Sequence, residues 1–296
     1  MLNRNPLVSV IMNCFNGEKY LSDSINSVLK QSYQNWELIF WDNKSTDSSE
    51  KIFRSIKDKR CKYFCAKEHT SLYEARNLAI EKTNGAYIGF LDVDDYWLPN
   101  KIEKQIDLIN QKNTGVVYSN IWIRNEKKNK KKIFIKKNLY EGNIFNQIIE
   151  DYNIPINTVL VKKSIISELD KKFDERFNHI GDFDLIIRLS KITSFAALQY
   201  PTAVFRAHGN NLSTLDKMGS IKELELWLGE NSKRLSSQQV DCIQKRIDSG
   251  KIIYLKLNGR YIDPFKLVFK KRKNITLKNL ITVVLPSFLL KKILWY

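Results

Sequence analysis

An α/β fold with a mainly parallel central sheet is expected for the first hundred residues, because short apolar runs alternate there with helical patterns. Three of these runs, Val8–Met12, Glu37–Trp41 and Tyr87–Leu91, are apolar along all or nearly all of their length. Strands that are buried on both faces of a parallel sheet have this composition. A shorter run, Lys62–Cys65, adds a fourth strand to the expected sheet.

The helices between these strands are indicated by apolar residues spaced three and four positions apart, as in Leu21, Ile25 and Val28. The Ser-Thr-Asp sequence at residues 45–47 is a helix N-cap signal, and Pro99 stands at a first-turn position. The expected helices cover Tyr20–Gln31, Ser48–Ile56, Leu72–Lys82 and Asn100–Asn110.

After residue 115 the alternation is less regular. The patterns indicate strands at Val116–Ile123, Lys132–Ile135, Thr158–Val161 and Ala203–Phe205, and helices near Asn143–Glu150 and Asp182–Lys191. From about residue 219 onward the chain is expected to be helical, with Trp227, Leu228 and Leu235 on one face. We therefore expect one sheet-containing domain over residues 1–215 and a basic helical region over residues 216–296.

The formal net charge of +17 comes from two segments. Residues 124–137 hold eight basic residues and one acidic residue, and residues 251–296 hold eleven basic residues and one acidic residue. The rest of the chain is neutral, which favours two patches that contact an anionic surface over a protein that is basic throughout and binds nucleic acid. The alternative for residues 124–137 is a solvated, lysine-rich face.

Four cysteines are few for a chain of 296 residues, and Cys61 and Cys65 have no second Cys/His pair at zinc-site spacing. Reduced thiols fit a cytoplasmic protein. We expect no secretory leader, because the first apolar run, Leu7–Met12, is short and is followed by Asn13. The most apolar later stretch, Leu280–Leu290, has eleven residues and is expected not to span a bilayer.

Polar segments follow three of the expected strands, at the edge of a parallel sheet where ligands bind. They begin at or next to Asn13, Asp42 and Asp92. The last one has the sequence DVDD, and its three carboxylates repel one another unless a cation neutralises them. Asp92 and Asp94 are expected to face one side of an extended segment, so that both contact one Mg²⁺ or Mn²⁺ ion. The alternative is a solvated acidic turn.

Four segments in the same order resemble the family-2 glycosyltransferases with a GT-A fold, of the bacterial polysaccharide and O-antigen type. They are VSVIMNCFNGEKYLSDSINSVLKQSYQNWELIFWDNKSTDSS, EARNLAIEKTNGAYIGFLDVDDYWLPNKIEKQI, NTVLVKKSIISELDKKFDERFNHIGDFDLIIRLS and VFRAHGNNLS. The resemblance covers about residues 6–214 and implies a GT-A, Rossmann-like nucleotide-diphospho-sugar transferase fold. It assigns a nucleotide-binding half to about residues 1–115 and an acceptor-binding half to about residues 116–215.

The resemblance also implies a nucleotide-sugar donor, with UDP as the favoured nucleotide, and Mn²⁺ or Mg²⁺ as cofactor. Asp42 matches a carboxylate that binds the nucleobase, and Arg76 matches a residue that holds the nucleotide. Asp92 and Asp94 match the metal-binding DxD motif, and His208 matches a histidine that completes the metal site. A lone histidine in a loop has a structural role as its alternative. Further donor contacts are expected from the strand-end residues Asn13, Phe15, Asn16, Asp92 and Asp95.

Asp182 matches the general base of this family, which takes the proton of the acceptor hydroxyl in an inverting single displacement. The family usually has Glu-Asp at this point, whereas this chain has Gly181-Asp182, a difference that affects the expected acceptor more than the base. Asn43 stands where the family often has a second aspartate; an amide keeps the hydrogen-bonding capacity and loses the charge. The alternative for Asp182 is a helix N-cap without chemistry.

These features predict a metal-dependent hexosyltransferase that moves a sugar to a saccharide or lipid-linked saccharide in cell-surface polysaccharide synthesis. The alternatives are a catalytically inactive homologue, a nucleotidyltransferase, and a basic module that binds nucleotides or nucleic acid. The single glycine in the sequence NCFNGEKY counts against the phosphate loop of nucleotidyltransferases. Phe134 is the only aromatic residue in the basic run 124–137, which counts against a nucleic-acid platform.

Residues 262–296 combine lysine and arginine clusters with apolar stretches and end in Leu294-Trp295-Tyr296. Helices of this composition are typical of the membrane interface, so we expect peripheral attachment to the inner face of the cell membrane. The alternative is a helix pair that packs on the sheet-containing domain and leaves its lysines solvated.

Overall fold

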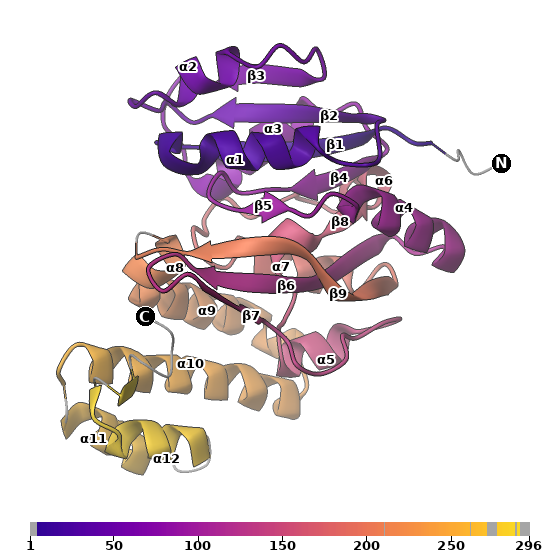
Figure 1. Ribbon diagram of the computed structural model, residues 1–296. Helices are drawn as coiled ribbons and strands as arrows, with labels where there is room; N and C mark the ends of the chain where they lie inside the picture. The colour runs from indigo at the N-terminus through magenta and orange to yellow at the C-terminus, as the bar shows by residue number, and fades with distance from the viewer. Residues whose placement is uncertain (1–4, 210, 261, 271–276, 288, 291–296) are drawn as a thin grey trace. The chain divides into compact units, whose positions relative to one another are not determined.

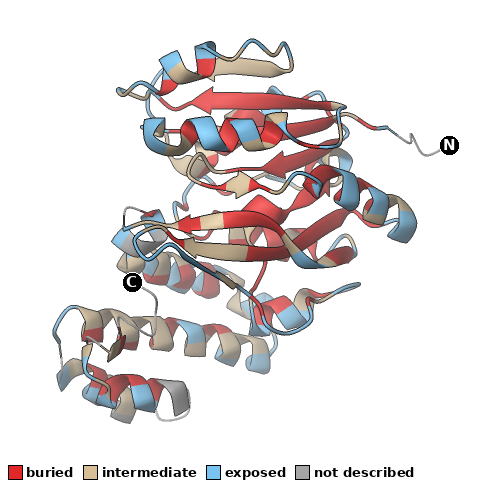
Figure 2. Ribbon diagram, viewed as in Figure 1, coloured by how far each residue is buried: buried red, intermediate tan, exposed pale blue. Residues whose placement is uncertain are grey.

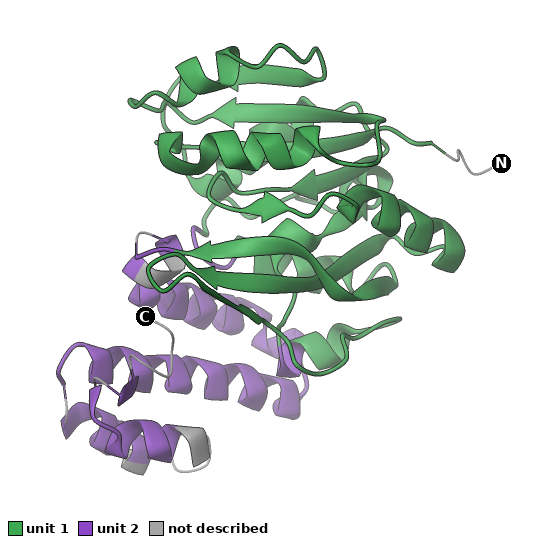
Figure 3. Cartoon of the chain, viewed as in Figure 1, with its two compact units in different colours: residues 1–148, 152–177, 181–207 green, residues 149–151, 178–180, 208–296 purple. Residues whose placement is uncertain are grey.

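The computed structural model describes residues 5–209, 211–260, 262–270, 277–287 and 289–290. By its contacts the chain divides into two compact units (Figure 3). Unit 1 comprises residues 1–148, 152–177 and 181–207, and unit 2 comprises residues 149–151, 178–180 and 208–296. The continuous part of unit 2 begins at residue 208, whereas the predicted helical region begins at residue 216.

The described part of unit 1 holds a nine-stranded mixed sheet with the order β3-β2-β1-β4-β8-β6-β9-β5, and β7 pairs with β6 (Figure 1). Strands β1 to β4 are parallel to one another, and so are β6 and β9. Strand β8 is antiparallel to both β4 and β6 and joins the two parallel groups. The strands are β1 (Val8–Cys14), β2 (Trp36–Asp42), β3 (Cys61–Cys65), β4 (Tyr87–Phe90), β5 (Tyr96–Trp97), β6 (Val116–Asn125), β7 (Lys130–Ile133), β8 (Leu160–Lys162) and β9 (Phe195–Ala207).

The expected α/β fold with a mainly parallel sheet is confirmed, since helices connect the first four strands in the predicted alternation. The helices up to residue 189 are α1 (Glu18–Leu29), α2 (Ser49–Arg54), α3 (Leu72–Glu81), α4 (Lys101–Lys112), α5 (Phe145–Glu150), the 3-10 turn η1 (Ile156–Thr158), α6 (Lys163–Ser167) and α7 (Gly181–Leu189).

The core of unit 1 covers both faces of β1 and β2, whose residues are nearly all buried (Figure 2). Val10 and Met12 of β1 pack in one cluster with Leu21 and Ile25 of α1, and each such side chain contributes roughly 1.5–3 kcal/mol when fully buried. The charged residue in the second apolar run, Glu37, is 3% exposed and is compensated by ion pairing and hydrogen bonding. Burial on both faces explains why these runs lack the alternation of a half-exposed strand.

Several predicted boundaries are wrong. The strand expected at Ala203–Phe205 is only the end of β9, which continues along β6 through an irregularity in the pairing. The strand expected at Thr158–Val161 begins later, after the η1 turn that follows Pro155. The two-residue strand β5 has too short a sequence signal to be expected, and the hairpin strand β7 lies two positions before the predicted Lys132–Ile135.

Unit 2 is helical over most of its described residues, as predicted from residue 219 onward. Its helices are α8 (Leu212–Leu215), α9 (Lys217–Asn231), the 3-10 turn η2 (Ser232–Arg234), α10 (Ser237–Leu257), α11 (Ile262–Lys270) and α12 (Leu277–Val284). Trp227 and Leu228 are buried, whereas Leu235 lies after η2 and is half-buried. Trp295 and Tyr296, which belong to the segment predicted to lie at the membrane interface, are outside the described residues.

None of the helices in the described ranges combines the length and the apolar character that crossing a bilayer requires.

Candidate active site

The loops after β1 and β2 are held together by hydrogen bonds, at the sheet edge where these parallel neighbours end. The Ser45 hydroxyl accepts from the Asn16 N–H at 3.0 Å, and Asn16 Oδ1 accepts from the Thr46 N–H at 2.8 Å. Asn16 has a φ of 54°, in the left-handed region that asparagine tolerates. In the structure Asn16 therefore fixes these two loops, and its expected donor contact stays a prediction.

Asp42 lies at the end of β2 and is 2% exposed. Its Oδ1 accepts from the Ser45 N–H at 2.8 Å, and its Oδ2 accepts from the Tyr63 hydroxyl at 2.7 Å. Burial, followed by the hydrogen bond to Asp42, raises the pKa of Tyr63 and keeps this hydroxyl a donor. Ser45 and Tyr63 therefore set the orientation of the Asp42 carboxylate.

The amide of Asn43 holds the loop before α3. Its Oδ1 accepts a hydrogen bond from the Thr70 backbone N–H at 3.2 Å, and its Nδ2 donates a second one to the Thr70 carbonyl at 2.8 Å. An aspartate could not donate the second hydrogen bond. The sequence difference at residue 43 thus has a structural reason.

Two aromatic rings lie next to these strand ends. Phe15 is 51% exposed, and its ring centroid is 4.2 Å from that of His69. His69 Nδ1 lies 2.9 Å from the Asn43 carbonyl oxygen, which fixes the imidazole. His69 was missed in the sequence because a single loop histidine carries no pattern. The exposed phenyl face is a surface on which a flat ring can stack.

Arg76 of α3 and Asp92 just after β4, which the resemblance assigned to one donor site, form an ion pair. The Arg76 side chain is buried, and its Nη2 lies 2.6 Å from Asp92 Oδ1. The Asp92 side chain remains 38% exposed. The ion pair therefore orients Asp92 and leaves part of its carboxylate open to a ligand.

The acidic segment after β4 is a turn, so the predicted extended conformation is wrong: the Asp95 N–H donates to the Asp92 carbonyl at 3.1 Å. Asp95 is 1% exposed and accepts from Asn157 Nδ2 at 2.5 Å and from the Arg206 N–H at 2.9 Å. Burial, and then the nearby Asp94 and Asp92, raises the pKa of Asp95. Asp95 thus ties the acidic turn to η1 and β9, and its expected donor contact stays a prediction.

Asp92 and Asp94 are the two partly exposed carboxylates of this turn. Over the described residues, no three His, Cys, Asp or Glu side chains form a group that could hold a metal by themselves. A Mg²⁺ or Mn²⁺ ion in a nucleotide site needs only one or two protein carboxylates, because phosphate oxygens and water complete its octahedron. The oxygen donors at the turn fit such an ion.

His208 belongs to unit 2. Its N–H donates to Asn211 Oδ1 at 2.7 Å, and its Nε2 lies 3.2 Å from Asn211 Nδ2. These bonds set the orientation of the ring within unit 2, and its role as a metal ligand stays a prediction.

Asp182 lies in the first turn of α7. Its Oδ1 accepts from the Phe183 N–H at 2.8 Å and lies 3.4 Å from the Tyr73 hydroxyl, which donates to it. Tyr73 comes from α3, is 3% exposed, and has its ring 5.4 Å from the Arg76 guanidinium. Asp92, Arg76, Tyr73 and Asp182 therefore form one connected set between the end of β4 and the start of α7.

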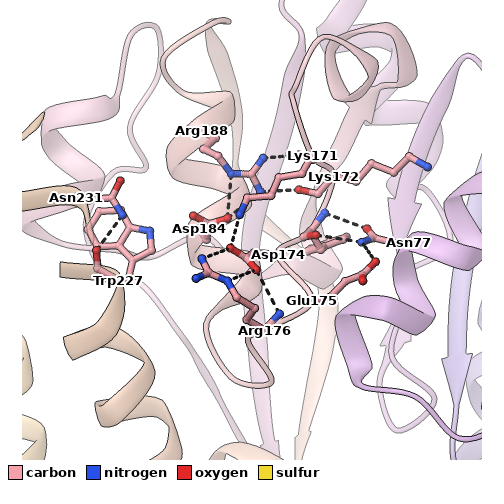
Figure 4. Close-up of polar contacts among 11 residues, drawn as sticks. Asn77, Lys171, Lys172, Asp174, Glu175, Arg176, Asp184, Arg188, Trp227 and Asn231 are labelled. Atoms are coloured by element: carbon pink, nitrogen blue, oxygen red, sulfur yellow. Dashed lines mark hydrogen bonds and ion pairs between the residues drawn. The ribbon is translucent and has the colours of Figure 1, made fainter. Parts of the chain in front are cut away.

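The segment 170–177, which precedes α7 in unit 1, is fixed by ion pairs (Figure 4). Asp174 lies 2.7 Å from Arg176 Nη2 and 2.5 Å from Lys171 Nζ. On α7, Asp184 pairs with Arg188 at 2.8 Å, and Arg188 donates to two backbone carbonyls of the same segment. These contacts hold the segment against the helix that carries Asp182.

Two side-chain amides, those of Asn13 and Asn153, are shielded from solvent and make no hydrogen bond within the described residues. Asn13 stands at the end of β1, and Asn153 stands before η1. A buried amide without partners is costly, so each is a candidate for a ligand contact. Asn13 was predicted from the sequence, whereas Asn153 was not, because nothing local distinguishes a loop asparagine.

The open α/β sheet, with carboxylates and an exposed aromatic ring at the ends of its parallel strands, defines the class of α/β proteins in which ligands bind at the carboxyl ends of the strands. Within this class the chain belongs to glycosyl transferase family 2, whose family model matches residues 9–166. The resemblance seen in the sequence is thereby confirmed, and the chain is a glycosyltransferase.

Two of the relatives are bacterial proteins with glycosyltransferase names. The chain is 31% identical over 192 residues to the UDP-Glc:alpha-D-GlcNAc-diphosphoundecaprenol beta-1,3-glucosyltransferase WfgD of Escherichia coli, covering 65% of this chain and 73% of WfgD. It is 38% identical over 121 residues to the putative teichuronic acid biosynthesis glycosyltransferase TuaG of Bacillus subtilis, covering 40% of this chain and 48% of TuaG.

Solved structures support the same fold. S. aureus TarS in complex with UDP-GlcNAc superposes with a TM-score of 0.68 at 18% identity, covering 86% of this chain and 75% of that chain. The mannosyltransferase PcManGT from Pyrobaculum calidifontis, in complex with GDP-Man and Mn²⁺, gives a TM-score of 0.54 at 14% identity, covering 78% and 64%. The predicted GT-A-like fold is confirmed.

Proposed function

We propose that the chain transfers a hexose from a UDP-sugar to a lipid-linked saccharide in the synthesis of a cell-surface polysaccharide. The observation that carries the proposal is the connected set of Asp92, Arg76, Tyr73 and Asp182, which joins the expected diphosphate side to the expected base. The name of WfgD, with a UDP-glucose donor and a diphosphoundecaprenol-linked acceptor, supports the substrate classes. The UDP-GlcNAc bound to TarS supports the nucleotide.

The chemistry is an inverting single displacement. The acceptor oxygen attacks the anomeric carbon, the bond from that carbon to the diphosphate oxygen breaks, and Asp182 takes the acceptor proton. Arg76 orients Asp92 and contributes a positive charge beside the expected diphosphate. Tyr73 holds the Asp182 carboxylate through its hydroxyl.

Asp92 and Asp94 would hold a Mn²⁺ or Mg²⁺ ion together with the diphosphate, and His208 is the proposed additional ligand. Such an ion supplies stabilisation of the negative charge that grows on the leaving diphosphate. In the nucleotide pocket we assign the base edge to Asp42, the stacking surface to Phe15, and further contacts to Asn13, Asn16 and Asp95.

The proposed place of action is the cytoplasmic face of the cell membrane, where a lipid-linked acceptor and a nucleotide-sugar meet. The acceptor-side residues of this proposal are Asp182 and the unpaired amide of Asn153.

A thermal-shift panel of UDP, GDP, CDP and dTDP, each with and without Mn²⁺, tests the nucleotide and metal assignments together. At 100 times its Kd a nucleotide should stabilise the wild type by about 2.7 kcal/mol. We expect UDP to give this shift only with Mn²⁺, and Asp94→Ala to abolish it. Asp182→Asn should keep the shift, because Asp182 acts on the acceptor.

The matched control is Asp107→Ala, which removes an exposed carboxylate of α4 and should leave the UDP shift unchanged. A wild type that responds to no nucleotide would contradict the proposal and favour an inactive homologue. A UDP shift that does not depend on Mn²⁺ would contradict the metal assignment alone.

A further inference from the structure

Helix α12 presents apolar side chains to solvent. Leu280, Ile281 and Val284 are 46%, 50% and 75% exposed, and their positions fall along one side of the helix. The polar residues Asn279 and Thr282 of the same helix are 3% and 4% exposed. A helix on a protein surface in water has the opposite arrangement, with its polar side outward.

Hydrogen bonds to α10 fix this orientation. Asn279 Nδ2 donates to the Ser249 hydroxyl at 2.9 Å. Lys256, which is 4% exposed, donates from Nζ to the Val283 carbonyl at 2.7 Å. Rotating α12 to bury its apolar side would leave these buried polar groups without partners, which is costly. The exposed apolar side is therefore a consequence of the packing within unit 2.

Helix α11 contacts both α10 and α12 (Figure 1). It also exposes apolar side chains. Ile262 and Phe265 are 69% and 44% exposed, and the exposed Lys266 follows directly. A hollow of about 350 Å³ in unit 2 borders α11, and its lining combines apolar and charged side chains: Met218, Lys251, Leu255, Asp263, Lys266 and Leu267. Unit 2 thus exposes apolar side chains together with lysines.

The charge of the region indicates what covers this surface. Residues 251–296 contain eleven basic residues and one acidic residue. A second copy of the chain would bring two such positive regions together, which repel each other. An anionic lipid bilayer provides an apolar environment for the exposed side chains and a charge opposite to that of the region.

We propose that α11 and α12 form a surface that binds the interface of an anionic lipid bilayer. The five exposed apolar residues enter the boundary below the headgroups, namely Ile262, Phe265, Leu280, Ile281 and Val284, and the exposed Lys266 contacts the headgroups. The purpose of this surface rests on the proposed function, because a lipid-linked acceptor lies in such a bilayer. Nucleotide binding is measured without vesicles, so the two proposals fail independently.

Co-sedimentation of the full chain with vesicles tests the surface. The vesicles contain phosphatidylcholine alone or phosphatidylcholine mixed with phosphatidylglycerol. We expect the wild type to bind the anionic vesicles more tightly than the neutral ones. The double variant Ile281→Glu/Val284→Glu should bind anionic vesicles about tenfold or more weakly, because two apolar side chains no longer enter the interface.

Two further variants separate the surface from general effects. Ile192→Glu makes the same change at a residue of unit 1 that is 45% exposed, and should bind vesicles like the wild type. Lys266→Glu changes only an exposed charge, so it should fold normally, weaken binding to anionic vesicles and leave binding to neutral vesicles unchanged.

Three results would overturn the inference. The wild type could fail to bind anionic vesicles, or the double variant and Lys266→Glu could both bind like the wild type. Alternatively, ultracentrifugation could find a wild-type dimer that the double variant dissociates, in which case a second copy covers the surface.

Discussion

At the residue scale, the ring of Tyr73 limits the size of the side chain that position 181 can hold. The Tyr73 ring is buried, and a Cβ added at Gly181 would lie 2.5 Å from it. Carbon atoms do not approach so closely, and a buried ring has no free space into which to move. The glutamate that the family usually has before the base would therefore not fit beside this tyrosine. In this chain a tyrosine hydroxyl is near Asp182 instead.

Replacing Gly181 by alanine should consequently destabilise the protein by about 1–3 kcal/mol, the usual cost of overpacking. Chemical denaturation at neutral pH measures this difference. Gly229→Ala is the matched control, because nothing lies within 4 Å of a Cβ added at Gly229 in the last turn of α9. The control should gain up to about 1 kcal/mol from helix propensity. Equal stability of Gly181→Ala and the wild type would show that the Tyr73 ring can move.

The candidate site was predictable only in part. Asp92 and Arg76 stand in local motifs, and the structure brings them within hydrogen-bonding distance. Tyr73, His69 and Asn153 stand in no motif, because their position depends on segments that are distant in the sequence. The partners of a residue are a tertiary property, even where its type and position are evident.

At the element scale, the conformation of the segment 170–177 is stabilised by the ion pairs that Asp174 makes with Lys171 and Arg176 (Figure 4). The Asp174 side chain is 6% exposed, whereas its partners Lys171 and Arg176 are 51% and 52% exposed. The hydrogen bond from Arg176 is the main cause that lowers the pKa of Asp174 well below its ordinary value of 3.8. The charged carboxylate is thus more stable in the folded than in the unfolded protein.

We expect Asp174→Asn to lower the free energy of unfolding by about 1–2 kcal/mol at pH 7, a value reduced because the two partners are half-exposed. The folded pKa lies below the unfolded one, so this stabilisation is fully present above about pH 5. It is lost as the pH falls through and below 3.8. Urea denaturation at several pH values should therefore find a difference between variant and wild type that shrinks on acidification.

The control for this prediction is Glu50→Gln, which breaks an exposed ion pair with Arg54 and should have no measurable effect. A difference between Asp174→Asn and the wild type that stays constant down to pH 2 would contradict the assigned role of the charge.

At the scale of the whole molecule, the sheet of unit 1 shields Cys14 at the end of β1. Cys14 is 1% exposed, and burial raises the pKa of its thiol. Cys65 at the end of β3 is exposed. A thiol reagent can therefore reach Cys65 in the native state, whereas it reaches Cys14 only when the sheet opens.

Thiol labelling of the native protein should thus show a fast phase for Cys65, a slow phase for Cys14 and intermediate rates for the half-buried Cys61 and Cys242. A nucleotide that binds only the native protein, present at 100 times its Kd, should slow the labelling of Cys14 about a hundredfold. The labelling of Cys65 should be unchanged. Cys65→Ser should remove the fast phase. Labelling of Cys14 at the rate of Cys65 would contradict the described burial.

The sequence by itself determined the α/β class, the first four strands and the polar segments that follow them. These properties depend on the period of apolar residues and on spacing within a few residues, which are local. The acidic segment after β4 and the basic, apolar C-terminal region were evident for the same reason.

Only the tertiary structure decided the antiparallel strand β8, the length of β9, the partners of Asp42 and Asp182, and the outward apolar side of α12. Each depends on contacts between residues that are distant along the chain. The periodicity of α12 indicates an amphipathic helix, but the hydrogen bonds to Ser249 and from Lys256 determine which side faces solvent. Which face is buried follows from packing, because a local pattern specifies two faces without specifying their neighbours.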